Sequence, residues 1–154
     1  MTRRRQRISF AILMAILLLS GCASKDDCPV TEPAWALSPE DGAILNPPAY
    51  EYFFINEDQS IWASAWWAEP LEDYPLILEE GIKVGWFRPE GAELVITGRR
   101  LDADAPPLES HVPCCYPTRF QATGLYFPVE GCWEVNAKAA DKELTFVVWL
   151  EPSK

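Results

Sequence analysis

The sequence is poor in basic residues and in histidine, and the common catalytic motifs are missing from it. Lys and Arg number 13 against 23 Asp and Glu, which gives a formal net charge of −10 at pH 7. Nucleic-acid binding needs a basic footprint, so we expect no nucleic-acid partner. Histidine occurs once, at His111, whereas cupredoxin-like electron carriers use two. A Gly-x-Ser-x-Gly elbow, a His-Glu-x-x-His helix, a phosphate loop and a dinucleotide fingerprint are all lacking, so we expect neither an enzyme nor a cofactor.

The sequence also lacks a long hydrophobic run. Its longest uninterrupted apolar stretch, Phe10 to Leu19, has about ten residues, too few for a helix across the roughly 30 Å hydrocarbon layer. The stretch follows the basic start "MTRRRQR" and leads into "LSGC" at positions 19–22. This order of basic, apolar and small residues predicts a secretory signal peptide over residues 1–21. Its end resembles the lipobox of bacterial lipoproteins, which implies that Cys22 is lipidated on its sulfur after cleavage.

We therefore expect an extracytoplasmic lipoprotein that is anchored to the membrane by lipid on Cys22. Each buried methylene contributes about 0.8 kcal/mol, so two or three acyl chains hold a protein durably. The expected place is the outer face of the cytoplasmic membrane, or the outer membrane if the cell has two membranes, because Ala23 is not the aspartate that retains lipoproteins at the inner membrane. Cleavage removes four of the 13 basic residues, so the net charge becomes 9 − 23 = −14. An acidic surface repels anionic headgroups, so attachment depends on the lipid.

Helical patterns are scarce after the signal peptide. Fourteen prolines are scattered through the chain, and no segment keeps a 3.6-residue apolar period. Aromatic and β-branched runs predict strands instead, separated by turn-like segments such as "EDQS" at 57–60 and "RPEG" at 88–91. The expected strands cover residues 50–56, 61–68, 82–87, 92–101, 123–128, 132–139 and 143–150.

The last two runs form the clearest hairpin. Alternation places Trp133, Val135, Ala137 and Ala139 on one face of the first strand, opposite an apolar stripe in residues 144–150. Short strands with regular turns predict an all-β fold, an antiparallel β-sandwich. The segment "PVEGCWEV" (128–135) resembles the entry to the penultimate strand of bacterial immunoglobulin-like domains, which implies an immunoglobulin-like sandwich.

The expected organisation has three parts. A lipoprotein signal peptide covers residues 1–21, the lipidated Cys22 and an extended tether cover 22–48, and the immunoglobulin-like domain covers 49–154. The segments "CPVT" (28–31), "GRRLDADAPPL" (98–108) and "FQATGLYFPVEGCWEV" (120–135) resemble a group of small secreted bacterial lipoproteins. That resemblance implies the sandwich fold and an extracytoplasmic location, but it implies no mechanism.

The remaining cysteines predict disulfides, because an even number of them in an exported chain favours pairing. They are Cys28, Cys114, Cys115 and Cys132. Cys132 faces away from the apolar side of its strand, where an N-terminal segment crossing the outside of the sheet could reach it. Cys28 is the natural candidate, which leaves Cys114 and Cys115 for each other. In the alternative pairing, each of the two adjacent cysteines bonds one of the distant ones.

The expected function is that of a non-catalytic binding or structural module of the cell envelope, with an envelope protein or a small ligand as its partner. The candidate binding surface combines the loop 102–118 with the aromatic run 61–68. Its residues are Trp62, Trp66, Arg99, Arg100, Tyr116 and Arg119. The arginines could bind an anion, and ion pairs with neighbouring acids are their alternative role.

Two other functions fit particular residues. His111, Cys114 and Cys115 could supply soft ligands to copper or zinc. However, zinc sites usually space their cysteines two to four residues apart, whereas adjacent cysteines in an extended segment point to opposite sides. Trp62 and Trp66 share one face of the expected strand, so they could form a platform for a sugar ring if that face is exposed.

Overall fold

The computed structural model describes residues 24–39, 48–68, 81–114 and 116–151, which are almost entirely β-strand and loop. The strands are β1 (Ala34–Leu37), β2 (Tyr50–Ile55), β3 (Trp62–Ser64), β4 (Ile82–Phe87), β5 (Leu94–Arg100), β6 (Glu109–His111), β7 (Phe120–Tyr126), β8 (Gly131–Ala139) and β9 (Lys142–Leu150). Two short 3-10 helices, η1 (Lys25–Asp27) and η3 (Trp66–Ala68), accompany them. Within these ranges no helix is long and apolar enough to cross a bilayer. The expected signal peptide, Cys22 and Cys115 lie outside the described residues.

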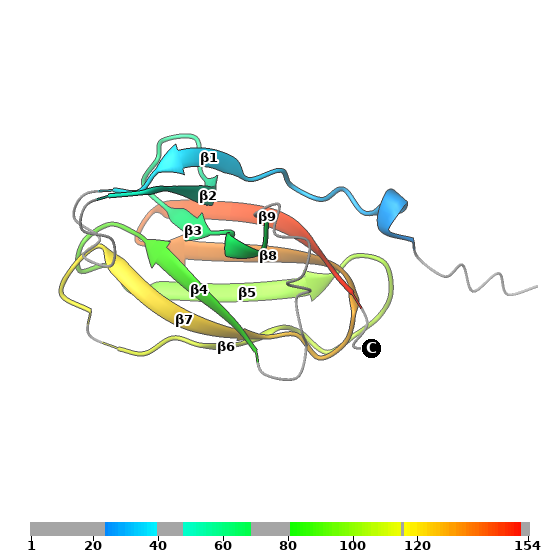
Figure 1. Cartoon of the computed structure of the whole chain (residues 1–154). Coiled ribbons are helices and arrows are strands. Elements are labelled where there is room, and N and C mark those ends of the chain that lie inside the picture. The colour runs from blue at the N-terminus through cyan, green and yellow to red at the C-terminus, as the bar shows by residue number, and fades with distance from the viewer. Residues whose placement is uncertain (1–23, 40–47, 69–80, 115, 152–154) are drawn as a thin grey trace, which may run out of the picture.

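The strands form two antiparallel sheets. The larger sheet has the order β1-β2-β3-β4-β7-β6, and the smaller has the order β5-β8-β9. In Figure 1 the larger sheet faces the viewer, and β4 crosses in front of β5 and β8. This arrangement confirms the predicted all-β sandwich. The finer assignment to an immunoglobulin-like topology stays a prediction.

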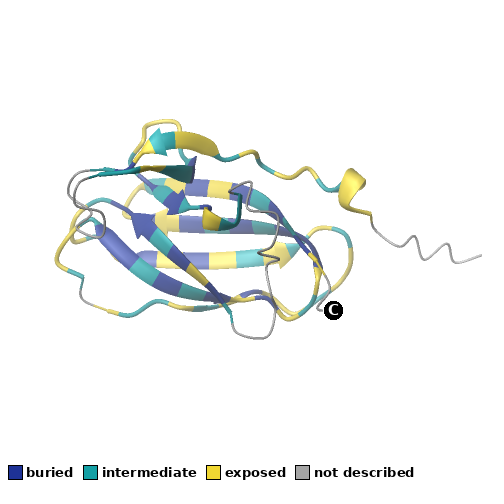
Figure 2. Cartoon of the chain, in the orientation of Figure 1, coloured by how far each residue is buried: buried dark blue, intermediate teal, exposed yellow. Residues whose placement is uncertain are grey.

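The core lies between the two sheets and follows the predicted alternation. Trp133, Val135 and Ala137 on β8 are fully buried, and Phe146 on β9 is 1% exposed. Phe146 stacks on Phe54 of the larger sheet, with ring centroids 4.1 Å apart. Figure 2 shows the same alternation as bands of buried and exposed residues along β8 and β9. The β8–β9 hairpin is therefore confirmed.

Several elements differ from the sequence-based expectation. β6 lies within the expected loop 102–118, and β7 begins at Phe120, three residues before the expected strand. Part of the segment 22–48, expected as a tether, forms β1, which pairs with β2 in the register Trp35↔Tyr52. The run 61–68, expected as one strand, is a strand only as far as Ser64, and Trp66–Ala68 turns as a 3-10 helix. The segment 88–91 does turn, with a hydrogen bond from the Ala92 N–H to the Pro89 carbonyl, but the strands on either side of it join different sheets.

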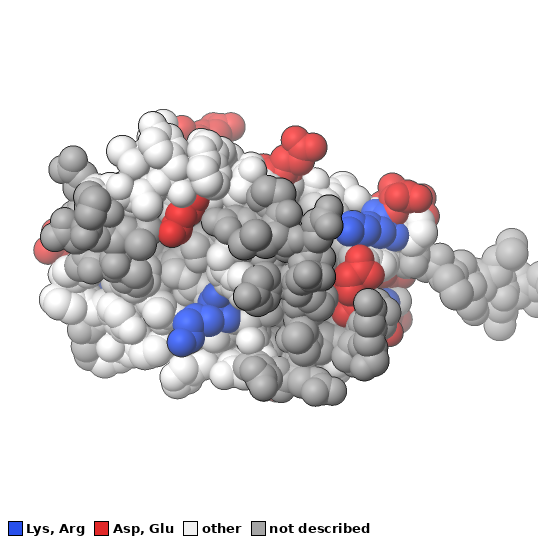
Figure 3. Space-filling view, viewed as in Figure 1, with Lys and Arg blue, Asp and Glu red and all other residues white. Residues whose placement is uncertain are grey.

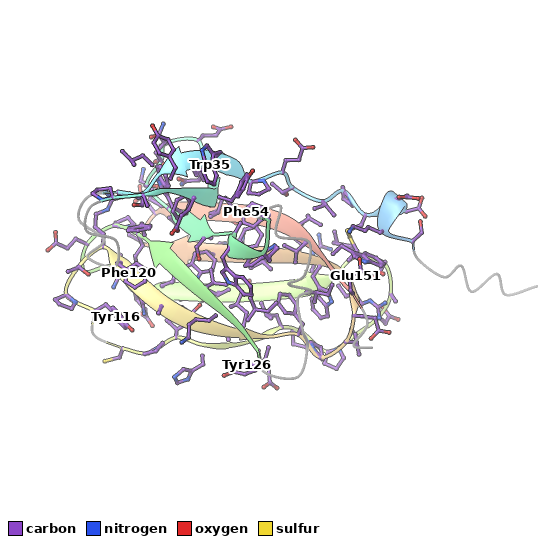
Figure 4. The ribbon with its side chains drawn as sticks, in the orientation of Figure 1. Trp35, Phe54, Tyr116, Phe120, Tyr126 and Glu151 are labelled. Carbon is purple, nitrogen blue, oxygen red and sulfur yellow. A yellow bond between two sulfur atoms is a disulfide. The ribbon has the colours of Figure 1, made fainter. Side chains whose placement is uncertain are left out.

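A disulfide joins Cys28 to Cys132 on β8, so the N-terminal segment crosses the outside of the smaller sheet, as the orientation of Cys132 predicted. Beyond it, the Thr31 N–H donates to the Val147 carbonyl (2.9 Å), and the Val147 N–H donates to Thr31 Oγ1 (2.9 Å). Lys25 Nζ lies 3.4 Å from a carboxylate oxygen of Glu151, which Figure 4 labels at the same end of the domain. The described chain therefore begins and ends at one end of the sandwich.

Candidate functional site

A second apolar cluster lies on the face of the larger sheet that points away from the core. Phe53, Phe87 and Phe120 are its buried members, and Trp62 and Tyr116 pack against them. The Phe87 ring centroid lies 6.1 Å from that of Phe53 and 5.5 Å from that of Phe120, both in edge-on contacts. Because strand residues alternate between faces, β2, β4 and β7 supply apolar side chains to both sides of the sheet. On this outer face, Phe53, Phe87 and Phe120 are 1%, 6% and 9% exposed.

Small residues cross this outer face as a row. Phe53 pairs with Ser64, and Gly85 pairs with Ala122. Ser64 and Gly85 are neighbours across β3 and β4, since the Gly85 N–H donates to Ser64 Oγ at 2.9 Å. Ser64, Gly85 and Ala122 therefore form a low floor that runs perpendicular to three strands.

Taller side chains border this floor on both sides. One border is aromatic, because the register sets Trp62 beside Phe87 and Phe87 beside Phe120. The other border contains Trp66, whose Nε1 donates to the Lys83 carbonyl at 2.8 Å. The low row between two taller ones is a groove, which we call the transverse groove.

The transverse groove has a volume of about 360 Å³, within the range of small-molecule sites. It is lined by Ser38, Pro39, Glu51, Phe53, Ser64, Trp66, Lys83, Gly85, Phe87, Phe120 and Ala122. The lining is mainly apolar, the phenylalanines are buried, and Trp66, at 43% exposed, lies at the rim with the exposed Lys83. Figure 3 shows this side of the molecule, where uncharged residues predominate in the described part and the charged groups gather mainly at the end from which the N-terminal segment emerges.

Lys83 is the cation of the groove. Among the residues that the structure describes, its ammonium has no hydrogen-bond or ion-pair partner. A second hollow of about 350 Å³ shares Lys83 and Ala122 with the groove and extends to His111 and Tyr126. Lys83 thus lies where the two hollows meet.

Gly85 keeps the floor of the groove low. A Cβ atom at this position would lie 2.9 Å from Cε2 of Phe120 and 3.5 Å from Ser64 Oγ. A side chain at residue 85 would therefore push against the aromatic border. The glycine in "KVGWF" is the sequence signal for the groove, because it interrupts an otherwise bulky strand on its outward face.

The structure divides the predicted binding surface between the two sheets. Trp62 and Trp66 lie on the larger sheet with Tyr116, whereas Arg99 and Arg100 belong to β5 of the smaller one.

The predicted residues on the larger sheet are packed against their neighbours. Trp62 is half-buried against Phe53 and donates its Nε1 hydrogen to the Gln59 carbonyl (2.8 Å). Tyr116 packs near Phe120, with centroids 6.4 Å apart; Figure 4 labels both rings. Arg119 is half-buried, and its Nε donates to the Arg88 carbonyl at 3.3 Å.

Arg99 and Arg100 form the ion pairs that were their alternative role. Arg99 Nε lies 2.7 Å from Glu134, whose hydrogen bond raises the pKa of the guanidinium, and Arg100 Nε lies 2.6 Å from Asp102. Burial alone would raise the pKa of Asp102, but hydrogen bonds from Arg100 and from the backbone outweigh it and leave the pKa below its ordinary value. Both arginines are engaged on the smaller sheet, away from the transverse groove.

A buried arginine holds the segment that contains the adjacent cysteines. Arg88 is 3% exposed and donates to Gln121 Oε1 (2.7 Å), the Pro89 carbonyl (2.9 Å) and the Tyr116 carbonyl (3.3 Å). Gln121 Nε2 in turn donates to the Pro113 carbonyl at 2.7 Å. Burial lowers the pKa of Arg88. Arg88 and Gln121 therefore fix the backbone on both sides of the cysteine pair.

The metal hypothesis rests on His111 and that cysteine pair. Cys114 is disulfide-bonded. A disulfide sulfur is not the thiolate that binds zinc or copper, so Cys114 offers no such ligand in this state. In the described ranges, no three His, Cys, Asp or Glu side chains gather as a metal site. Copper or zinc binding stays an untested alternative.

No protein-family model, curated protein or solved structure matches this chain. The function is therefore inferred from the fold and from the transverse groove. Sequence reasoning named Trp66 but missed Lys83, Gly85 and the three phenylalanines. The sequence pattern that could have identified these groove residues is the alternation of side chains along a strand. It puts apolar residues of 50–56, 82–87 and 120–126 on both faces of one sheet.

Proposed function

We propose that the chain is a lipid-anchored, extracytoplasmic binding module, without catalytic activity, whose ligand occupies the transverse groove. The observation that carries this proposal is the groove itself: an apolar hollow of about 360 Å³ on the outward face of the larger sheet, with Trp66 and Lys83 at its rim. Ligand sites are concave and mainly apolar, and a few polar groups fix the orientation of the ligand. Lys83 is such a group, while the aromatic border supplies the contact area.

The Cys28–Cys132 disulfide determines how a lipid on Cys22 would place the domain relative to the membrane. If Cys22 carries the lipid, the disulfide-bonded Cys28 lies six positions after the anchor in the chain. An extended chain of that length spans at most about 20 Å. The disulfide would then hold one end of the sandwich near the membrane and leave the faces of both sheets accessible from the side.

Photo-crosslinking in intact cells tests the binding site. A benzoylphenylalanine in place of Trp66 lies at the rim of the groove, whereas one in place of Val95, which is 50% exposed on the smaller sheet, serves as the matched control. We expect a specific adduct at residue 66 and none at residue 95. Equal labelling at the two positions, or no adduct at residue 66, contradicts the proposal.

The anchor is tested separately by labelled palmitate and membrane fractionation. The wild-type chain should incorporate the label and sediment with membranes, and Cys22→Ser should abolish both. A Cys22→Ser chain that still sediments with membranes contradicts lipid anchoring. Cys28→Ser is the matched control, because it removes a cysteine without touching the proposed lipidation site.

A second candidate function, carbohydrate recognition, is favoured by another aromatic group rather than by Trp62 and Trp66. Trp35 and Tyr50 are 56% and 58% exposed, with ring centroids 6.2 Å apart and planes inclined by 21°. Tyr52 lies 4.8 Å from Trp35 on the same face of β1 and β2. Exposed aromatic faces suit the apolar face of a sugar ring. If glycans bind here, Trp35→Ala should abolish a glycan-induced change in fluorescence; a glycan panel without any change contradicts this candidate.

A further inference from the structure

We propose that the ligand of the transverse groove is a single unbranched acyl chain that ends in a carboxylate, with the carboxylate at Lys83 and the hydrocarbon along the floor of Ser64, Gly85 and Ala122. The inference rests on the proposed function and adds the chemical class of the ligand. The width, the chemistry and the charge of the groove each point to this class.

The width of the groove admits one extended chain. Phe87 in one border and Lys83 in the other are four residues apart on β4, so their Cα atoms are about 13 Å apart at 3.3 Å per residue. Side chains from both borders occupy part of that span. An α-helix with its side chains is about 10–12 Å across and does not fit between them. The floor is one residue wide, which suits a chain without branches.

The chemistry of the floor favours hydrocarbon over peptide or sugar. The backbone N–H and C=O groups of β3, β4 and β7 lie in the plane of the sheet and already have partners. The ladders use them in pairs such as Phe53↔Ser64 and Gly85↔Ala122. Next to these pairs, the Gly85 N–H donates to Ser64 Oγ and the Lys83 carbonyl accepts from Trp66 Nε1. An extended peptide in the groove would bury amide groups against phenylalanine rings without partners, at a cost of about 1–3 kcal/mol for each group. Sugar hydroxyls face the same cost. Methylene groups have no such requirement and gain from burial.

The charge at the rim favours an anionic end group. Lys83 is exposed, and in the described part of the chain its ammonium has no partner. The protein as a whole is acidic, with a formal net charge of −10, so a cation without a partner beside an apolar hollow is unusual on its surface. A carboxylate at this point would gain a charge-assisted hydrogen bond. The lining also contains one acid, Glu51 on β2, which has an interaction of its own.

Calorimetric titration with dodecanoate and dodecanol tests the inference. The protein is the full chain with Cys22→Ser, so that no lipid attached at residue 22 competes for the groove. We expect saturable dodecanoate binding, with affinity increasing by up to about fourfold per added methylene along a series of shorter fatty acids. Lys83→Gln should weaken dodecanoate binding about fivefold and leave dodecanol binding unchanged. Lys138→Gln, an equal charge change on the smaller sheet, should affect neither.

Ala122→Leu should fill the floor and weaken both ligands at least about tenfold. Thr97→Leu, on the outward face of β5, is the matched control and should leave binding unchanged. Lys83 is exposed, so Lys83→Gln remains a test even if Ala122→Leu fails to fold.

Three outcomes would overturn the inference: no dodecanoate binding, equal effects of Lys83→Gln and Lys138→Gln, or binding that persists in a folded Ala122→Leu chain. An adduct at residue 66 in cells combined with no dodecanoate binding overturns the ligand class alone and leaves the binding-module proposal in place. The absence of any adduct at residue 66 overturns both.

Discussion

Replacement of both Cys28 and Cys132 by alanine should lower the free energy of unfolding by about 2–4 kcal/mol. The two residues are 104 positions apart, so the disulfide closes a loop that includes most of the domain. The chain-entropy relation gives about 4.7 kcal/mol for a loop of roughly 100 residues. We expect less than this upper value, because the hydrogen bonds between Thr31 and Val147 still hold the N-terminal segment after the disulfide is lost.

Guanidinium unfolding followed by tryptophan fluorescence measures this change, since Trp86 and Trp133 are fully buried and report on the core. At a few degrees per kcal/mol, the loss corresponds to a melting temperature lower by about 10 °C. Val30→Ala, at an exposed position on the same segment, is the control and should cost less than about 0.5 kcal/mol. A double variant that unfolds at the same guanidinium concentration as the wild type would show that the disulfide adds no stability and that backbone contacts alone hold the segment.

Three further predictions concern the core and two polar clusters. Phe146→Ala removes a ring stacked on Phe54 and should cost about 3–5 kcal/mol in the same unfolding assay. Gln121→Ala leaves the buried Arg88 without its Nε acceptor and should cost about 1–3 kcal/mol. Asp102 has a lowered pKa in the folded state, so its contribution to stability is present above the unfolded pKa of about 3.9 and is lost as pH falls through the lower, folded value. Asp102→Asn should therefore make melting temperature less dependent on pH below about pH 4.

A specific outcome would contradict each of these three predictions. A Phe146→Leu control keeps apolar bulk without the ring and should lose less stability than Phe146→Ala; equal losses would contradict a cost that depends on buried apolar volume. Gln121→Glu gives the buried guanidinium a charged acceptor and should retain more stability than Gln121→Ala; the reverse order contradicts the role assigned to residue 121. An Asp102→Asn chain with an unchanged slope of melting temperature against pH contradicts the cause assigned to the lowered pKa.

The part of the fold that alternation specifies was predictable from the sequence. β8 and β9 carry a period of two over nine residues each, and a short turn joins them, so their pairing and their buried faces follow directly. The same alternation put Cys132 on the outward face of β8, where the N-terminal segment with Cys28 can reach it. β1 and β6 were missed because they have four and three residues and depend on a neighbouring strand for their formation.

The candidate site was predictable only in part, because it depends on register across strands that are distant in the sequence. Ser64 and Gly85 become neighbours only after β3 and β4 pair, and Ala122 joins them only when β7 adds to the sheet. No local pattern shows that these three small residues form one row. The expected grouping of Arg99 with Trp62 failed for the same reason, because the chain changes sheets between β4 and β5.

The most direct test of the central claim is the crosslink yield at residue 66 in intact cells with and without Ala122→Leu. If the ligand occupies the transverse groove, the otherwise unchanged chain gives a strong adduct, and the yield falls to that of the residue 95 control when the floor of the groove is filled. An adduct at residue 66 that is unaffected by Ala122→Leu, in a chain that still folds, would show that the transverse groove is not the binding site.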